Sequence, residues 1–77
     1  MANIDEVRAV IAGTFKLPVE SVRADTAMGS IPAWDSVGQV NLMMAIEQEF
    51  DIFLEVEDFA RLISVPAIAE YLDRAGG

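Results

Sequence analysis

Three stretches of the 77-residue chain repeat their apolar side chains at the spacing of an α-helix, and this periodicity constrains the fold more than any other feature. In the first stretch the apolar positions are Ile4, Val7, Val10, Ile11 and Phe15. This helix should end before Leu17, because the residue before Pro18 is forced out of helical geometry. No stretch alternates apolar and polar residues as a β-strand does. The sequence therefore predicts an all-α protein.

Four helices are expected, over residues 4–15, 36–50, 55–61 and 65–75. Asn3 and Glu6 fit a capping box at the start of the first helix. Ser64, with Pro66 in the first turn, fits the start of the last helix. Three long helices and a short third helix make a small four-helix bundle. We expect this bundle to be a single domain over residues 1–77.

A long connection, residues 16–35, joins the first two helices and contains two prolines and Gly29. The apolar residues expected to anchor it to the core are Leu17, Val19, Val22, Met28 and Ile31. A connection this long is uncommon in a compact domain unless it has a function.

Composition excludes several classes of protein. Hydrophobic residues make up 53% of the chain, which suffices for a core, and there is no cysteine or histidine. Folding therefore depends on neither disulfides nor a thiolate metal site, and no metal-ligand spacing such as an EF-hand loop is present. No apolar run approaches the roughly 18 to 20 residues of a membrane span, and the N-terminal residues lack a secretory pattern. We expect a cytoplasmic protein.

The net charge of −8 arises entirely in the middle of the chain. Between residues 24 and 60 there is no lysine or arginine, and the acidic residues there are Asp25, Asp35, Glu47, Glu49, Asp51, Glu55, Glu57 and Asp58. The negative electrostatic field of these residues repels nucleic acid and anionic membranes and attracts proteins with basic patches. The acids either form a docking surface, which their segregation favours, or keep a small apolar domain soluble.

The expected helix over residues 36–50 has two apolar stripes, and one small core cannot face both. The stripe expected to face the core is Leu42, Met43, Ile46 and Phe50. The other stripe is Val37, Val40 and Met44. It either forms a protein-binding surface beneath Ser36, rimmed by Glu47 and Gln48, or is buried by the loop and a neighbouring helix.

Asp35-Ser36 stands at the start of this helix, in a chain without histidine. A nucleophilic serine normally needs a neighbouring base, so we expect Ser36 to be modified and the protein not to be an enzyme. Ser36 with Gln39 also fits a capping box, and Asp35 is a second candidate cap. A phosphodiester on Ser36 would lie at the positive end of the helix dipole, which favours anions. Capping alone does not account for the apolar stripe, the segregated charge and the long loop.

The run Asp35-Ser36-Val37, followed by VNLMMAIEQEFDI and later by SVPAIAEYL, resembles acyl carrier proteins and related carrier domains. The resemblance covers essentially the whole chain and is most specific over residues 34–72. It implies that Ser36 is esterified by 4′-phosphopantetheine, transferred from coenzyme A by a magnesium-dependent phosphopantetheinyl transferase of the holo-acyl-carrier-protein synthase type. The thiol of that arm would hold acyl or aminoacyl intermediates as thioesters and present them to partner enzymes.

The resemblance also implies a surface for those partners. Acyl-loading and acyl-processing enzymes with basic patches would contact Val37, Val40, Met44 and Glu47. The carrier is expected to be a monomer. In such carriers the cargo can fold back between the second and third helices, where Phe59, Leu62 and Ile63 would lie opposite Ile46 and Phe50. These side chains are bulky and are expected to be core, so a short, polar or aminoacyl cargo is as compatible as an acyl chain.

Several residues depart from the pattern of fatty-acid carriers. Val37 stands where leucine is usual, Gly38 and Asn41 stand where acids are typical, and Trp34 replaces a small residue. Trp34 would pack either on the arm or between the loop and the bundle. The departures favour a discrete carrier for polyketide, nonribosomal peptide, aminoacyl or modified-lipid synthesis over general fatty acid biosynthesis.

Two other classes remain open from the residues alone. In a helical interaction module, Ser36 would only cap the helix and the second apolar stripe would bind a partner without any arm. The terminal Gly76-Gly77 suggests a ubiquitin-like modifier, but that class requires a strand-rich fold, which the helical periodicity contradicts.

Overall fold

The computed structural model describes residues 4–75, and within them it has four α-helices and no β-strand. The elements are α1 (Ile4–Phe15), η1 (Val19–Ser21), α2 (Ser36–Phe50), α3 (Val56–Arg61) and α4 (Val65–Ala75), where η1 is a short 3₁₀ helix. The predicted all-α fold and the predicted bounds of α1, α2 and α4 are confirmed. Helix α3 begins one residue later than expected, because Glu55 is its N-cap and donates its N–H to the Asp58 carboxylate at 2.9 Å. The capping box predicted at Asn3 lies outside the described residues.

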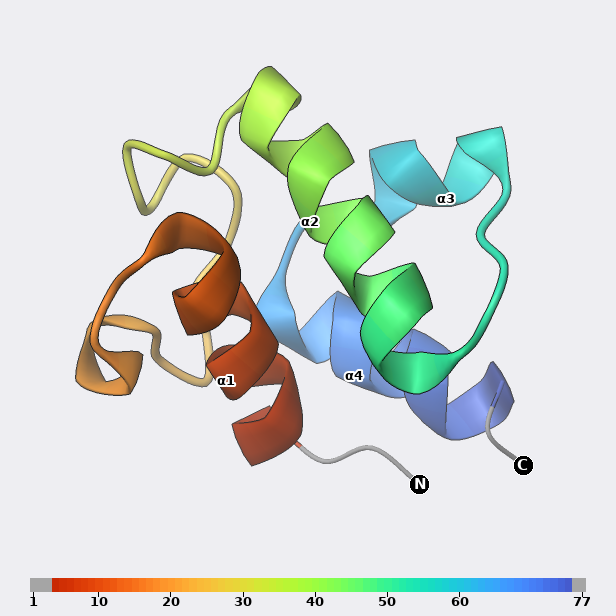
Figure 1. Cartoon of the computed structure of the whole chain (residues 1–77), viewed down its shortest axis with the longest axis horizontal. Helices are drawn as coiled ribbons and strands as arrows, with labels where there is room; N and C mark the ends of the chain where they lie inside the picture. The colour runs from red at the N-terminus through yellow and green to blue at the C-terminus, as the bar shows by residue number, and fades with distance from the viewer. Residues whose placement is uncertain (1–3, 76–77) are drawn as a thin grey trace.

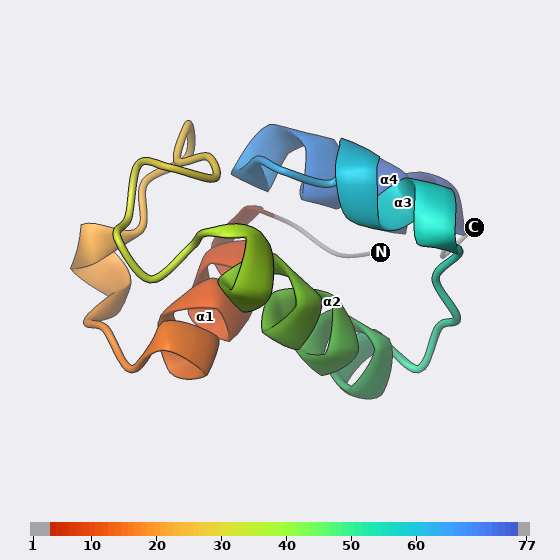
Figure 2. The same ribbon diagram turned by 90° about the horizontal axis from the view of Figure 1, so that it is seen from above.

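The helices form two layers. Seen from above, α1 and α2 lie in one layer and α3 and α4 in the other (Figure 2). Helix α1 packs against both α2 and α4, and the long connection from α1 to α2 projects from one end of the bundle (Figure 1). Between residues 4 and 75, no helix is both long and apolar enough to cross a membrane.

One apolar core lies between the layers. The stripe of α2 predicted to face inward does so: Leu42, Met43 and Ile46 are fully buried, and Phe50 is half-buried against them. The other fully buried large side chains are Val7, Ile11, Val22, Trp34, Val65 and Ile68. Trp34 comes from the long connection, so the segment just before α2 is part of the core.

Both apolar anchors and backbone hydrogen bonds hold the long connection in place. Val22 and Ile31 are buried and Leu17 is half-buried, as predicted, but Val19 and Met28 are 41% and 38% exposed, so their prediction as anchors was wrong. The physical reason is that their main chains make the contacts. The Val19 carbonyl accepts a hydrogen bond from Arg8 Nη2 at 3.1 Å, and the Met28 N–H donates to the Ile63 carbonyl at 2.7 Å.

The same connection is tied to the start of α4. The Val65 N–H donates to the Thr26 carbonyl at 2.8 Å, and Ser64 Oγ accepts from the Ala67 N–H at 3.2 Å. The predicted start of α4 at Ser64 is therefore confirmed. The loop before α2 and the turn before α4 consequently form one hydrogen-bonded unit.

Candidate cofactor-attachment site

Ser36 is the first residue of α2, and its side chain is exposed. Among residues 4–75, no hydrogen-bond partner is found for its hydroxyl. Asp35 is the N-cap: its Oδ1 accepts from the Gly38 N–H at 2.8 Å, and its carbonyl accepts from the Gln39 N–H at 2.8 Å. The capping box suggested for Ser36 and Gln39 was therefore wrong, because Asp35 caps the helix and the Gln39 side chain is buried. The hydroxyl of Ser36 is left free for chemistry.

The start of α2 suits a phosphate group on Ser36. In the described part of the chain, the N–H groups of Ser36 and Val37 have no protein acceptor, and they point out of the positive end of the helix dipole. Unpaired N–H groups at a helix start are favourable for a phosphate. The residues present therefore fit a phosphodiester attached at Ser36 Oγ.

Gly38 allows the loop to cross the first turn of α2 at close range. A Cβ at this position would lie 2.1 Å from the Ala33 carbonyl oxygen and 3.0 Å from Phe15 Cε1. No side chain fits such distances, so glycine is required here by packing. From the sequence alone, Gly38 was noted only as a glycine at a position where fatty-acid carriers typically have an acidic residue. The signal that could have revealed this role is that glycine inside a helix is destabilising and usually has a packing reason.

Trp34 packs the loop onto the bundle. Its side chain is 0% exposed, and its ring centroid lies 6.2 Å from that of Phe15 with an interplanar angle of 34°. Its Nε1–H donates to Gln39 Oε1 at 2.7 Å. Of the two interpretations offered for Trp34, packing between loop and bundle is confirmed, because a fully buried ring is not accessible to an arm on Ser36.

The second apolar stripe of α2 is exposed. Val37, Val40 and Met44 are 72%, 45% and 49% exposed, which rules out its burial by loop and neighbouring helix. Phe53 and Val56, in the α2–α3 connection and at the start of α3, are also highly exposed. Sequence reasoning missed both, because short apolar stretches between acidic residues have no clear period.

Glu47 has a structural contact. Its Oε2 accepts a hydrogen bond from the Leu54 N–H at 2.9 Å, and its side chain is half-buried. It therefore holds the α2–α3 connection against α2. Of the residues expected to lie between α2 and α3, Leu62 is buried and Phe59 packs on the core, whereas Ile63 is exposed in the turn after α3. The expectation that Ile63 is core was wrong, since its carbonyl, not its side chain, makes the contact to the loop.

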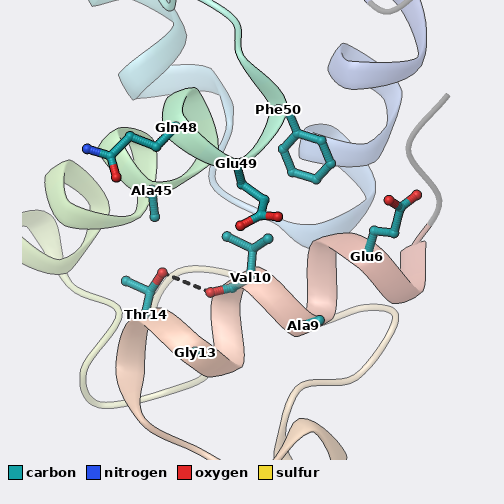
Figure 3. Close-up of a pocket in the computed structure, with 9 residues that line it drawn as sticks. All are labelled: Glu6, Ala9, Val10, Gly13, Thr14, Ala45, Gln48, Glu49 and Phe50. Atoms are coloured by element: carbon teal, nitrogen blue, oxygen red, sulfur yellow. Dashed lines mark hydrogen bonds between the residues drawn. The ribbon is translucent and has the colours of Figure 1, made fainter.

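A groove lies between α1 and the C-terminal half of α2 (Figure 3). Its volume is about 640 Å³. Its lining residues are Glu6, Ala9, Val10, Gly13, Thr14, Ala45, Gln48, Glu49 and Phe50. It lies at the opposite end of α2 from Ser36 and is separate from the candidate attachment site.

Comparison with known proteins agrees with this geometry. Residues 5–72 match the family described as "Phosphopantetheine attachment site", and the chain belongs to this family. It is similar to the acyl carrier protein of Bdellovibrio bacteriovorus, with 32% identity over 76 residues that cover 99% of this chain and 97% of the relative.

Other relatives carry the same description. The acyl carrier protein of Campylobacter jejuni subsp. doylei is 29% identical over 73 residues, covering 95% of each chain. Acyl carrier protein 3 of Ralstonia nicotianae is 28% identical over 72 residues, covering 94% of this chain and 83% of the relative. The protein is thus a carrier of acyl intermediates, and phosphopantetheine is its prosthetic group.

Proposed function

We propose that Ser36 is the residue to which 4′-phosphopantetheine is attached. One observation carries the proposal: Ser36 is the exposed first residue of α2, its hydroxyl makes no hydrogen bond within residues 4–75, and Asp35 has the capping role that would otherwise occupy a serine. The arm, once attached, supplies a thiol on which intermediates are held as thioesters.

The attachment chemistry requires a second protein. The Ser36 oxygen forms an ester bond to phosphorus while the phosphoanhydride bond of coenzyme A breaks and the nucleotide half leaves. The serine proton must go to a base, and this chain has no histidine to accept it. Asp35 is already engaged in capping Gly38. The base therefore comes from a phosphopantetheinyl transferase, and the carrier contributes a positioned hydroxyl.

The partner-binding face is proposed to be Val37, Val40 and Met44, with Glu47 at its rim. The exposure of all three apolar side chains supports this, because an exposed apolar patch with methionine suits an interface that several enzymes must share. Acyl-loading and acyl-processing enzymes with basic patches would be attracted electrostatically to the acidic middle segment, residues 24–60. We further propose a monomeric, cytoplasmic carrier that serves a specialised pathway for polyketide, peptide, aminoacyl or modified-lipid synthesis.

Mass spectrometry tests the attachment site. The protein is incubated with coenzyme A and a broad-specificity phosphopantetheinyl transferase, and one phosphopantetheinyl group should be added. Ser36→Ala should gain no mass, whereas Ser21→Ala, which removes another exposed serine, should be modified like the wild type. An unmodified wild type, or a mass gain that persists in Ser36→Ala, would contradict the proposal.

A further inference from the structure

A chain of buried hydrogen bonds runs from the loop before Ser36 to the end of α3. Trp34 Nε1 donates to Gln39 Oε1 at 2.7 Å, and Gln39 Nε2 donates to the carbonyls of Phe59 and Leu62, both at 2.9 Å. Gln39 is 4% exposed, and its amide uses both N–H donors and its oxygen. A buried amide with every group paired is strongly oriented, because any rotation leaves a polar group unpaired.

These bonds join the start of α2 to the end of α3, two segments that are twenty or more residues apart in the sequence. Gln39 lies about one helical turn after Ser36 on α2, and Trp34 lies two residues before Ser36. The two hydrogen-bonded residues therefore stand on either side of the proposed attachment serine in the sequence. Phe59 and Leu62 stand at the C-terminal end of α3, whose last carbonyls have no partner within their own helix. Gln39 supplies donors for two of them. A short helix of this length has little stability of its own, so its position depends on such tertiary contacts.

We propose that Gln39 is a positioning residue, which with Trp34 holds Ser36 and α3 in one fixed relation so that a partner enzyme meets them as a preformed surface. This inference rests on the proposed attachment at Ser36. It predicts that loss of the Gln39 amide lowers the fraction of molecules in which the serine and α3 are correctly placed. Because only that fraction binds productively, the KM for the carrier rises while kcat is unchanged.

The test compares Gln39→Met with Thr14→Val. Each substitution removes side-chain hydrogen bonds to backbone carbonyls and keeps a side chain of similar size, but Thr14 lies on α1, where its hydroxyl bonds the Val10 carbonyl of the same helix at 2.8 Å. Phosphopantetheinyl transfer is measured as a function of carrier concentration, at a temperature where circular dichroism shows each variant to be fully folded. Gln39→Met should raise KM roughly threefold to tenfold with kcat unchanged. Thr14→Val should have the KM of the wild type.

Amide hydrogen exchange provides a readout that separates positioning from general destabilisation. In Gln39→Met the Leu62 N–H, bonded to the Asp58 carbonyl at 2.9 Å, should exchange faster, whereas amides at the centre of α1 should be unaffected. Trp34→Phe removes the indole donor and part of the buried ring, leaves both bonds from Gln39 to the α3 carbonyls in place, and should shift KM and exchange in the same direction by a smaller factor. It also decides the question if Gln39→Met does not fold.

The outcomes separate the two proposals. If the wild type is modified but folded Gln39→Met has an unchanged KM, or if Thr14→Val raises KM equally, the positioning role is overturned while the attachment site stands. If the wild type is not modified, or Ser36→Ala is, the attachment site itself fails.

Discussion

At the scale of single residues, the packing at the start of α2 depends on the absence of a side chain at Gly38. The Ala33 carbonyl occupies the space where a side chain would begin, in the same turn in which Asp35 accepts the Gly38 N–H and Ser36 is exposed. Loop, cap and serine therefore share one close contact. Position 38 is the point at which a one-carbon change should disturb all three.

Gly38→Ala should destabilise the protein by about 1–3 kcal/mol, because the new methyl group overlaps the Ala33 carbonyl and backbone must move. The matched control is Gly13→Ala on α1, where an added Cβ meets nothing within 4 Å. It should stabilise the protein by about 0.5–1 kcal/mol, since alanine is the better helix former. Urea unfolding measures both. Equal effects of the two substitutions would contradict the close contact.

At the scale of elements, α3 is held from both sides. Gln39 reaches it from α2, and Tyr71 reaches it from α4. Burial raises the pKa of the Tyr71 hydroxyl above its usual 10.0, and the negative charge and hydrogen bonding of Asp58 on α3 raise it further. The ionised form of Tyr71 is therefore less favourable in the folded protein than in the unfolded chain.

The stability of the protein should consequently fall as the pH rises above about 10. In that range the folded state retains the Tyr71 proton while the unfolded state loses it, so the unfolded state binds fewer protons and is increasingly favoured. Below pH 10 this contribution is constant. Urea unfolding across alkaline pH should show the fall in the wild type and a smaller one in Tyr71→Phe. Tyr71 is the only tyrosine, so the absorbance of tyrosinate follows its titration directly, and an ordinary pKa there would contradict the prediction.

At the scale of the whole molecule, the acidic middle segment includes the exposed stripe of α2 and all of α3 except Arg61. Because Glu47 accepts a hydrogen bond from Leu54, reversing its charge would disturb the α2–α3 connection as well as the field. Glu49 and Glu57 are exposed and are the better probes of the field.

The double variant Glu49→Lys/Glu57→Lys should lower kcat/KM for phosphopantetheinyl transfer roughly threefold to tenfold at low salt, with the difference shrinking as salt is added. The control, Glu20→Lys/Asp73→Lys, makes the same change of net charge at exposed positions outside the segment. Circular dichroism verifies that both variants are folded. If both double variants have the same rate, the placement of the charge has no role in docking.

Local rules account for what the sequence predicted of the fold. Apolar spacing, Pro18 and Ser64 act on neighbouring residues, and they were enough to place the bounds of α1, α2 and α4. They also identified the inward stripe of α2 and hence the exposed one. The absence of histidine predicted that Ser36 is modified, but the sequence left open whether Ser36 or Asp35 caps the helix, and the structure shows that Asp35 does.

Contacts between distant segments account for what the sequence could not predict. Gln39 was taken as a capping partner of Ser36, yet its amide bonds carbonyls that lie twenty or more residues further along the chain. Glu47 was taken as part of the rim of the binding face, yet it also bonds the Leu54 N–H. The spacing of residues along the chain does not predict these hydrogen-bond partners, because each bond depends on how two elements pack against one another.

The buried position of Trp34 has a further consequence. It is the only tryptophan of the chain, and it lies two residues before Ser36 with its indole bonded to Gln39. The tryptophan fluorescence of the protein therefore originates at one place, beside the hydrogen bond between Trp34 and Gln39. Any event that loosens this region exposes the indole to water and shifts its emission, so the carrier contains an unlabelled optical reporter next to the proposed attachment serine.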